Sequence, residues 1–127
     1  MSKQNTLIVL AILLFVVVPV VLFAMLSTKP PESGKYDALA SCLTDKGVKF
    51  YGAYWCSHCK AQKEMFGSSF ERLKYIECSL PGGQGQTEEC NKAGIKGYPT
   101  WEFGDGERLS GEVALATLAE KSECSLQ

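Results

Sequence analysis

Histidine is nearly absent from this chain of 127 residues, and neither sign of charge dominates it: thirteen Lys and Arg stand against fourteen Asp and Glu, with a single His. The basic residues form no cluster, so the composition gives no reason to expect nucleic acid as a partner. The chain also lacks a second closely spaced cysteine pair, since only Cys56 and Cys59 among its six cysteines are separated by two residues. A zinc cage built from two such pairs is therefore disfavoured, and we expect no metal site.

A long apolar run is present near the N-terminus. Leu7 to Leu26 are twenty apolar or small residues broken only by Pro19, enough for a helix that crosses the hydrocarbon core of a membrane. A cleaved signal peptide would have a shorter apolar core and small residues before its cleavage site, which the sequence from Phe23 to Ser27 does not provide. No cysteine follows the run before Cys42, which argues against a lipoprotein signal. We expect an uncleaved, single-pass signal anchor.

The remainder of the chain has the length of one small domain. We expect a tail at 1–6, the membrane span at 7–26, a linker containing Pro, Ser and Gly at 27–35, and one folded domain at 36–127. The charges that flank the span are nearly balanced and do not set its orientation. Six cysteines in so short a chain suit an oxidising compartment, so we place the domain on the extracytoplasmic side of the membrane.

One short motif carries redox chemistry. It lies between a strand-like and a helix-like stretch and reads Tyr54-Trp55-Cys56-Ser57-His58-Cys59. A helix N-terminus favours negative charge, so Cys56 should form the attacking thiolate readily, and His58 should stabilise that ionised form. The expected catalytic residues are Cys56, Cys59 and His58, with a bias towards giving the disulfide away. A purely structural local disulfide is the alternative.

A second motif follows about forty residues later, as Gly97-Tyr98-Pro99-Thr100-Trp101. Proline cannot donate to a sheet ladder, so Pro99 is expected at the start of a strand, after a Tyr98–Pro99 bond that is a candidate for the cis form. Together with the Trp55-Cys56-x-x-Cys59 motif, this resembles the thioredoxin family. The resemblance implies that a cis-proline loop faces the redox pair and that Tyr98, Pro99 and Trp55 border the substrate site, with Trp55 shielding the thiolate.

The resemblance can be narrowed, and it covers about residues 36 to 121. The matching segments are 51–56, 58–59, 62–63, 66–67, 77–78, Cys90, 93–95 and 98–101. They are similar to the thioredoxin-like domain that is fused to bacterial vitamin K epoxide reductase homologues. This implies a bacterial cytoplasmic membrane and reoxidation by a quinone-linked membrane thiol oxidase, whose four-helix domain is not among these residues. The chain departs from the pattern at Ser57, where that family more often has proline, and at Phe50, where many thioredoxins carry a buried acid.

The order of elements agrees with an α/β, thioredoxin-like fold in which helices flank a central mixed sheet. The periodicity and the punctuating residues predict a helix at 37–46, a strand at 48–53, a helix from 57 to 67, a strand at 73–79, a flexible loop at 81–85, a short helix at 87–93, a hairpin of 100–103 with 108–109, and a helix at 112–121.

Four cysteines remain outside the redox motif. The related fusion domains resemble this chain at Cys78 and Cys90, and a disulfide there would close a loop of about a dozen residues and contribute roughly 3 kcal/mol. The alternatives are two free buried thiols or an electron relay from the redox pair. This pairing leaves Cys42 and Cys124, whose bridge would contribute about 4 to 5 kcal/mol. An inert, buried Cys42 is the alternative.

We therefore expect a membrane-anchored thiol–disulfide oxidoreductase that promotes disulfide formation in exported, cysteine-containing proteins without a cofactor. Two alternatives stay open at this point. One is a reductase or isomerase that receives electrons from a membrane thiol transporter. The other is a non-catalytic module that binds cysteine-containing proteins or Cu(I) through the CxxC pair.

Overall fold

The computed structural model describes residues 2–26 and 33–127, and for Leu26 it describes the backbone alone. The chain divides into two units, Met1–Glu32 and Ser33–Gln127. Most of the expected linker, 27–35, lies outside the described residues. The first unit contains helix α1, Lys3–Leu26, which includes the expected span and begins earlier, inside the expected tail. This helix is apolar on every side and long enough to cross a membrane.

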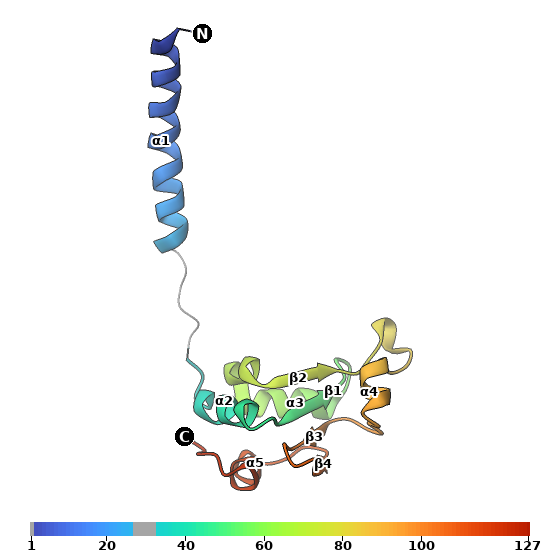
Figure 1. The fold of residues 1–127 in the computed structure, drawn as a ribbon. Helices are drawn as coiled ribbons and strands as arrows, with labels where there is room; N and C mark the ends of the chain where they lie inside the picture. The colour runs from blue at the N-terminus through green and yellow to red at the C-terminus, as the bar shows by residue number, and fades with distance from the viewer. Residues whose placement is uncertain (1, 27–32) are drawn as a thin grey trace. The chain divides into compact units, whose positions relative to one another are not determined.

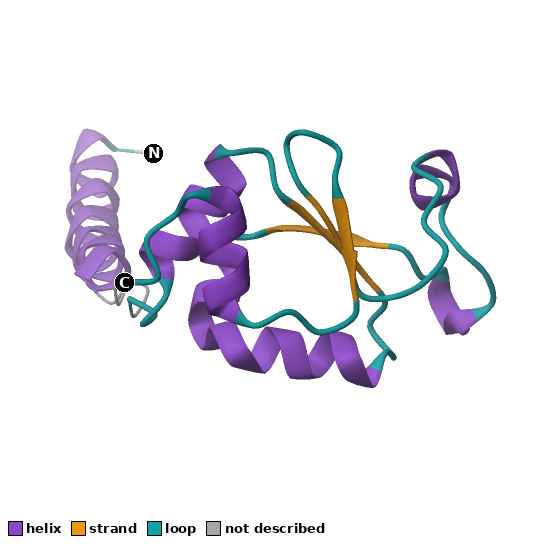
Figure 2. Cartoon of the chain, turned by 90° about the horizontal axis from the view of Figure 1, so that it is seen from below, coloured by secondary structure: helices purple, strands orange, loops and turns teal. Residues whose placement is uncertain are grey.

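The second unit is built on a four-stranded mixed sheet with the order β2-β1-β3-β4. Strand β1, Lys49–Gly52, runs parallel to β2, Lys74–Glu77, and antiparallel to β3, Thr100–Glu102, which in turn pairs with β4, Arg108–Ser110. Figure 2 shows these strands crossing the middle of the unit with helices on either side. The expected α/β architecture, a mixed sheet flanked by helices, is confirmed.

Helical segments connect the strands. In chain order they are α2 Asp37–Asp45, α3 Ser57–Phe66, the 3-10 segments η1 Gly67–Arg72 and η2 Pro81–Gly83, α4 Glu88–Lys92 and α5 Leu115–Ser122 (Figure 1). Most bounds lie close to the expected ones, but η1 was not foreseen, and η2 occupies part of the segment 81–85 that was expected to be a flexible loop. The last helix begins at Leu115 instead of Glu112, because the main chain of Val113 is hydrogen-bonded to a side chain of α3.

The alternation of side chains along β1 divides the core between the two faces of the sheet. Phe50 belongs to the larger cluster, where its ring lies 4.6 Å from that of Trp101. The neighbouring Tyr51 belongs to the smaller cluster, with the half-cystines Cys78 and Cys90. Both faces of β1 are therefore buried, which fixes the strand that leads into the CxxC motif.

Two disulfides join elements of this unit. Cys42 of α2 is bonded to Cys124, which follows α5, with 6.0 Å between their Cα atoms. Cys78, directly after β2, is bonded to Cys90 of α4, with a Cα separation of 5.6 Å. Only Cys56 and Cys59 are free thiols among the described residues.

Candidate active site

The two free thiols lie at the start of α3, one turn apart. Cys56 is the N-cap residue of the helix, with extended backbone angles of φ −74° and ψ 120°, and its sulfur accepts a hydrogen bond from the Cys59 amide at 3.4 Å. The Cys56 residue is 7% exposed, whereas Cys59 is fully buried. Cys56 is therefore the sulfur that a second molecule can reach, and the helix N-terminus favours its thiolate.

Cys59 has an environment that opposes ionisation. Burial is the main cause that raises its pKa, to about 12, and the neighbouring Cys56 adds to the effect. Lys63 and a backbone hydrogen bond with Ala53 act in the opposite direction but do not outweigh burial. At neutral pH Cys59 is therefore a thiol, and the two cysteines of the motif have distinct chemical roles.

The Tyr98–Pro99 peptide bond is cis, and its loop faces Cys56. The Cys56 thiol donates to the Tyr98 carbonyl oxygen at 3.7 Å, and Pro99 is fully buried at the start of β3. A cavity of about 510 Å³ opens beside this contact and is lined by Trp55, Cys56, Ser57, His58, Lys96, Gly97 and Tyr98. Of the residues that the sequence predicts for the redox and substrate-docking sites, Trp55, Cys56, His58 and Tyr98 line this cavity, whereas the fully buried Cys59 and Pro99 do not.

Trp55 borders this cavity with half of its surface exposed. Its indole N–H donates to the Ser79 hydroxyl at 2.8 Å, and its ring meets that of Tyr98 edge-on, with centroids 5.9 Å apart. The hydrogen bond holds the indole in place, while about half of the Trp55 surface remains exposed. Trp55 and Tyr98 therefore form an amphipathic wall next to the reactive sulfur.

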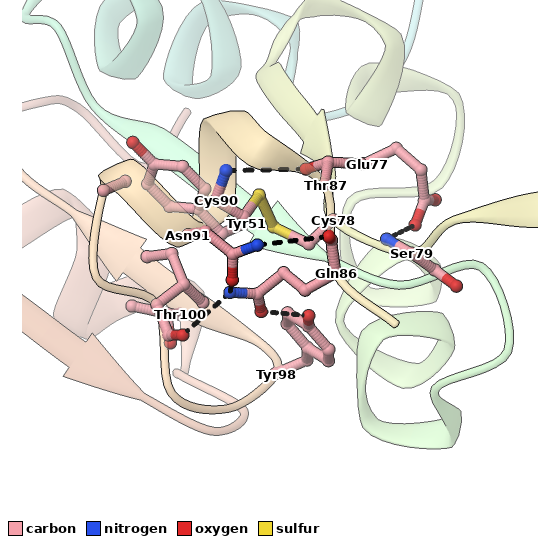
Figure 3. The surroundings of a disulfide bond; sticks show 12 residues. Tyr51, Glu77, Cys78, Ser79, Gln86, Thr87, Cys90, Asn91, Tyr98 and Thr100 are labelled. Carbon is pink, nitrogen blue, oxygen red and sulfur yellow. Dashed lines mark hydrogen bonds between the residues drawn. A yellow bond between two sulfur atoms is a disulfide. The ribbon is translucent and has the colours of Figure 1, made fainter. Parts of the chain in front are cut away.

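Tyr98 packs against the buried cluster that contains the Cys78–Cys90 disulfide, and Figure 3 shows its hydroxyl joined to Gln86 near this disulfide. The Tyr98 hydroxyl donates to the side-chain oxygen of Gln86, whose amide nitrogen donates to the Ile95 carbonyl at 3.1 Å. Gln86 stands in the segment that the disulfide closes. This bridge was expected to stabilise a loop, and in the structure the same loop also binds the hydroxyl of Tyr98, the expected docking residue.

His58 points away from the helix and is largely exposed, but its ring is fixed at one nitrogen. The Nδ1 atom lies 2.6 Å from Oε1 of Glu112, a residue of the segment between β4 and α5. Glu112 was expected within a helix, and its contact with His58 was not predicted. The one hint in the sequence was Gln62, a polar residue on the buried side of α3. Its side chain is hydrogen-bonded to the main chain of Val113, the residue that follows Glu112.

Phe50 occupies the position where many thioredoxins carry a buried acid. A tyrosine of β2, hydrogen-bonded to a glutamate of the same strand, lies near Cys59. A Cβ atom on Gly52 would lie 2.9 Å from the Tyr75 ring and 3.2 Å from the Cys59 sulfur, so the two flank the same point. The Tyr75 hydroxyl donates to Glu77, and burial, followed by this carboxylate, raises the pKa of Tyr75. Tyr75 is therefore neutral, and its ring lies on the β2 side of the buried thiol.

No protein-family model matches the chain. Among curated proteins, the thiol-disulfide oxidoreductase LTO1 of Arabidopsis thaliana is 48% identical over 93 residues, which are 70% of this chain and 24% of that protein. The protein disulfide isomerase-like 2-2 of Oryza sativa subsp. japonica is 38% identical over 46% of this chain and 17% of its own length. The protein disulfide-isomerase A3 of Gallus gallus is 37% identical over 47% and 12%, respectively.

The chain thus spans about a quarter or less of the length of these relatives. All three are named for thiol–disulfide chemistry, which is the chemistry that two free cysteines at a helix N-terminus can perform. Similarity to these oxidoreductases, on a mixed sheet flanked by helices, supports placing the chain in the thioredoxin-like superfamily.

Proposed function

We propose that the protein is a membrane-anchored thiol–disulfide oxidoreductase that passes the Cys56–Cys59 disulfide to cysteines of exported proteins. The observation that carries this proposal is the position of Cys56, at the N-terminus of α3 and opposite the cis Tyr98–Pro99 bond. The carbonyl of Tyr98 lies next to the sulfur and could pair with an extended substrate segment. A metal-binding CxxC needs no such loop, which makes the Cu(I) alternative less attractive.

The exchange proceeds in two balanced steps. A substrate thiolate attacks the Cys56 sulfur, the bond to Cys59 breaks, and the Cys59 sulfur takes the electron pair and a proton. A second substrate thiolate then attacks the substrate sulfur of the mixed disulfide, and Cys56 leaves as a thiolate that the helix N-terminus stabilises. The substrate has lost two electrons to the enzyme, whose dithiol must be reoxidised before another turnover.

The reoxidising partner in this proposal is a quinone-linked membrane thiol oxidase of the vitamin K epoxide reductase type. Support comes from the sequence resemblance and from α1, which is apolar enough to keep the domain at a membrane surface. The proposed location is a single-pass anchor in a bacterial cytoplasmic membrane with residues 36–127 on the extracytoplasmic side. Protease digestion of intact and permeabilised spheroplasts tests that side, because digestion of the domain in intact spheroplasts is expected.

One observation favours a second function. Cys59 lies one turn after Cys56, and its amide nitrogen is 3.4 Å from the Cys56 sulfur. This position suits resolution of a mixed disulfide by the enzyme itself, as in a reductase or isomerase, although the raised pKa of Cys59 means that the thiol must first lose its proton. The reduction potential of the pair separates the two functions: a value well above that of glutathione supports the oxidase, and a value well below it supports the reductase.

The test of activity uses the full chain in detergent micelles with a reduced dithiol peptide. Oxidised wild-type protein is expected to oxidise the peptide, whereas Cys56→Ser and Cys59→Ser have no disulfide to give and leave it reduced. With the oxidised peptide instead, the Cys56 thiolate of Cys59→Ser attacks the peptide disulfide, one peptide thiol leaves, and the mixed disulfide through Cys56 accumulates. The Cys59→Ser variant is the matched control, since it removes a sulfur from the same motif yet leaves the attacking position. Absence of both turnover and mixed disulfide would contradict a catalytic role and leave only binding.

A further inference from the structure

We infer that His58 and Glu112 form an acid–histidine pair in which His58 takes the proton of the incoming substrate thiol and Glu112 is the positioning residue. The inference rests on the proposed function and adds the group that activates the substrate. Glu112 was not foreseen from the sequence, because 54 residues separate it from His58.

The contact defines which nitrogen of His58 carries hydrogen. Nδ1 of His58 lies 2.6 Å from Oε1 of Glu112, and an ionised carboxylate can only accept a hydrogen bond, so Nδ1 must donate. In the neutral ring the other nitrogen, Nε2, is then unprotonated and can accept a proton. A carboxylate that fixes a histidine in this way also fixes the orientation of its ring.

The main chain around Glu112 is held from both sides, which distinguishes this pair from an incidental surface ion pair. On one side the Gly111 amide donates to the Pro99 carbonyl at 2.9 Å. On the other, Gln62 accepts from the Val113 amide at 2.7 Å and donates to the Val113 carbonyl at 3.0 Å. Gln62 is fully buried. Glu112 is therefore tied both to the cis-proline and to the helix that carries His58.

His58 also shares the substrate cavity with the reactive sulfur. The titratable groups that line this cavity with it are Cys56 from α3 and Lys96 and Tyr98 from the segment before β3, while Glu112 faces it from the segment before α5. Burial raises the pKa of Tyr98, so this phenol stays neutral at the pH of the reaction. Among the described groups around His58, Glu112 is thus the one negative partner in direct contact with its ring.

The proposed step balances as follows. The substrate thiol gives its proton to Nε2 of His58, and its sulfur attacks Cys56. The Cys56–Cys59 bond breaks, and its electron pair goes to the Cys59 sulfur. The imidazolium releases its proton to solvent and Cys59 takes one up, so the net transfer is one proton from the substrate to Cys59. Substrate thiols have pKa values near 8.5, so at neutral pH most of them need such a base.

The experiment measures the second-order rate constant for oxidation of a thiol peptide by the oxidised full chain in detergent, from pH 6 to 9.5. Glu112→Gln is expected to lower the rate about tenfold at pH 7. At pH 9.5 it should be no more than about twofold slower, because the peptide is already ionised there. Glu64→Gln is the matched control: it removes the same charge from an exposed site on α3, and no effect is expected.

A double variant, His58→Ala with Glu112→Gln, should be no slower at pH 7 than His58→Ala alone, since Glu112 acts through His58. An equal loss at every pH, or no loss at pH 7, would overturn the inference. A change in the urea midpoint of Glu112→Gln that accompanies a pH-independent loss would assign the residue a structural role instead. An inactive wild-type protein would count against the proposed function itself, so the two failures are distinguishable.

Discussion

Replacement of Gln62 by Leu tests how the active-site segments are held together. Gln62 is fully buried in α3, and its side-chain amide contacts four groups: the Val113 amide at 2.7 Å, the Val113 carbonyl at 3.0 Å, the Trp101 indole N–H at 3.4 Å and the Met65 sulfur at 3.4 Å. Leucine has a similar volume and is apolar, so the substitution removes the hydrogen bonds and leaves the packing largely unchanged. We expect a marked loss of stability and a loosened segment around Glu112.

The magnitude follows from the groups that lose their partners. A buried donor or acceptor left without a partner costs about 1 to 3 kcal/mol, and the long bond to Trp101 lies at the low end. Val113 is 8% exposed, so a small shift lets water reach its main chain and recovers part of the cost. We expect the free energy of unfolding to fall by about 3 kcal/mol.

The assay is urea unfolding of the full chain in detergent, followed by tryptophan fluorescence. Both tryptophans lie in the unit Ser33–Gln127, so the signal reports that unit and not α1. Gln84→Leu is the matched control, because Gln84 is exposed and its loss should change stability by less than about 0.5 kcal/mol. A fall in the free energy of unfolding of less than about 1 kcal/mol for Gln62→Leu would refute the reasoning. If the reasoning holds, the hydrogen-exchange rate of the Val113 amide should also rise in this variant.

Two further predictions concern titratable groups. In the native, reduced protein at pH 9, iodoacetamide should alkylate Cys59 more than about 100-fold more slowly than in the urea-unfolded protein, because burial raises the pKa of Cys59 to about 12. Cys56 should react first. Equal alkylation rates of Cys59 in the native and unfolded protein would contradict this prediction. Burial opposes ionisation of Glu102, but hydrogen bonds from Lys49 and Arg108 hold its pKa below the ordinary value, so its contribution is present above about pH 4.5 and lost in acid. Glu102→Gln should therefore cost about 1 kcal/mol at pH 7 and almost nothing at pH 2.5, as measured by urea unfolding at the two values.

Local signals in the sequence account for most of the fold. Gly47 ends α2 in the left-handed region with φ +77°, and Thr87 caps α4 by accepting from the Cys90 amide, as the residue types indicate. Periodicity and punctuation suffice here because each element is defined by neighbours in the sequence. The start of α5 could not be placed in this way, because the segment before it is held by Gln62, 51 residues earlier.

In the candidate site, too, the residues within short motifs could be predicted and the residues distant in sequence could not. The cysteines, the histidine and the proline loop are recognisable because each belongs to a short motif with a chemical reason for its spacing. Glu112, Gln86 and Ser79 could not be predicted, since each contributes one polar atom to a residue of the site across a long stretch of sequence or through a loop. Single polar residues of this kind have no periodicity and look like ordinary surface positions.

The surroundings of Cys59 show why resemblance alone does not transfer redox behaviour. The Phe50 ring packs 4.6 Å from Trp101 and 5.6 Å from Phe70, so a carboxylate at this position would be buried among aromatic rings without a partner. The ring of Tyr75, from the neighbouring strand, lies near Cys59 instead, and its hydroxyl donates to Glu77. A neutral phenol does not favour the thiolate as a cation would, nor repel it as a carboxylate would. The protonation of Cys59, and with it the leaving-group step of the exchange, is therefore governed chiefly by burial in this chain and not by an acid at position 50.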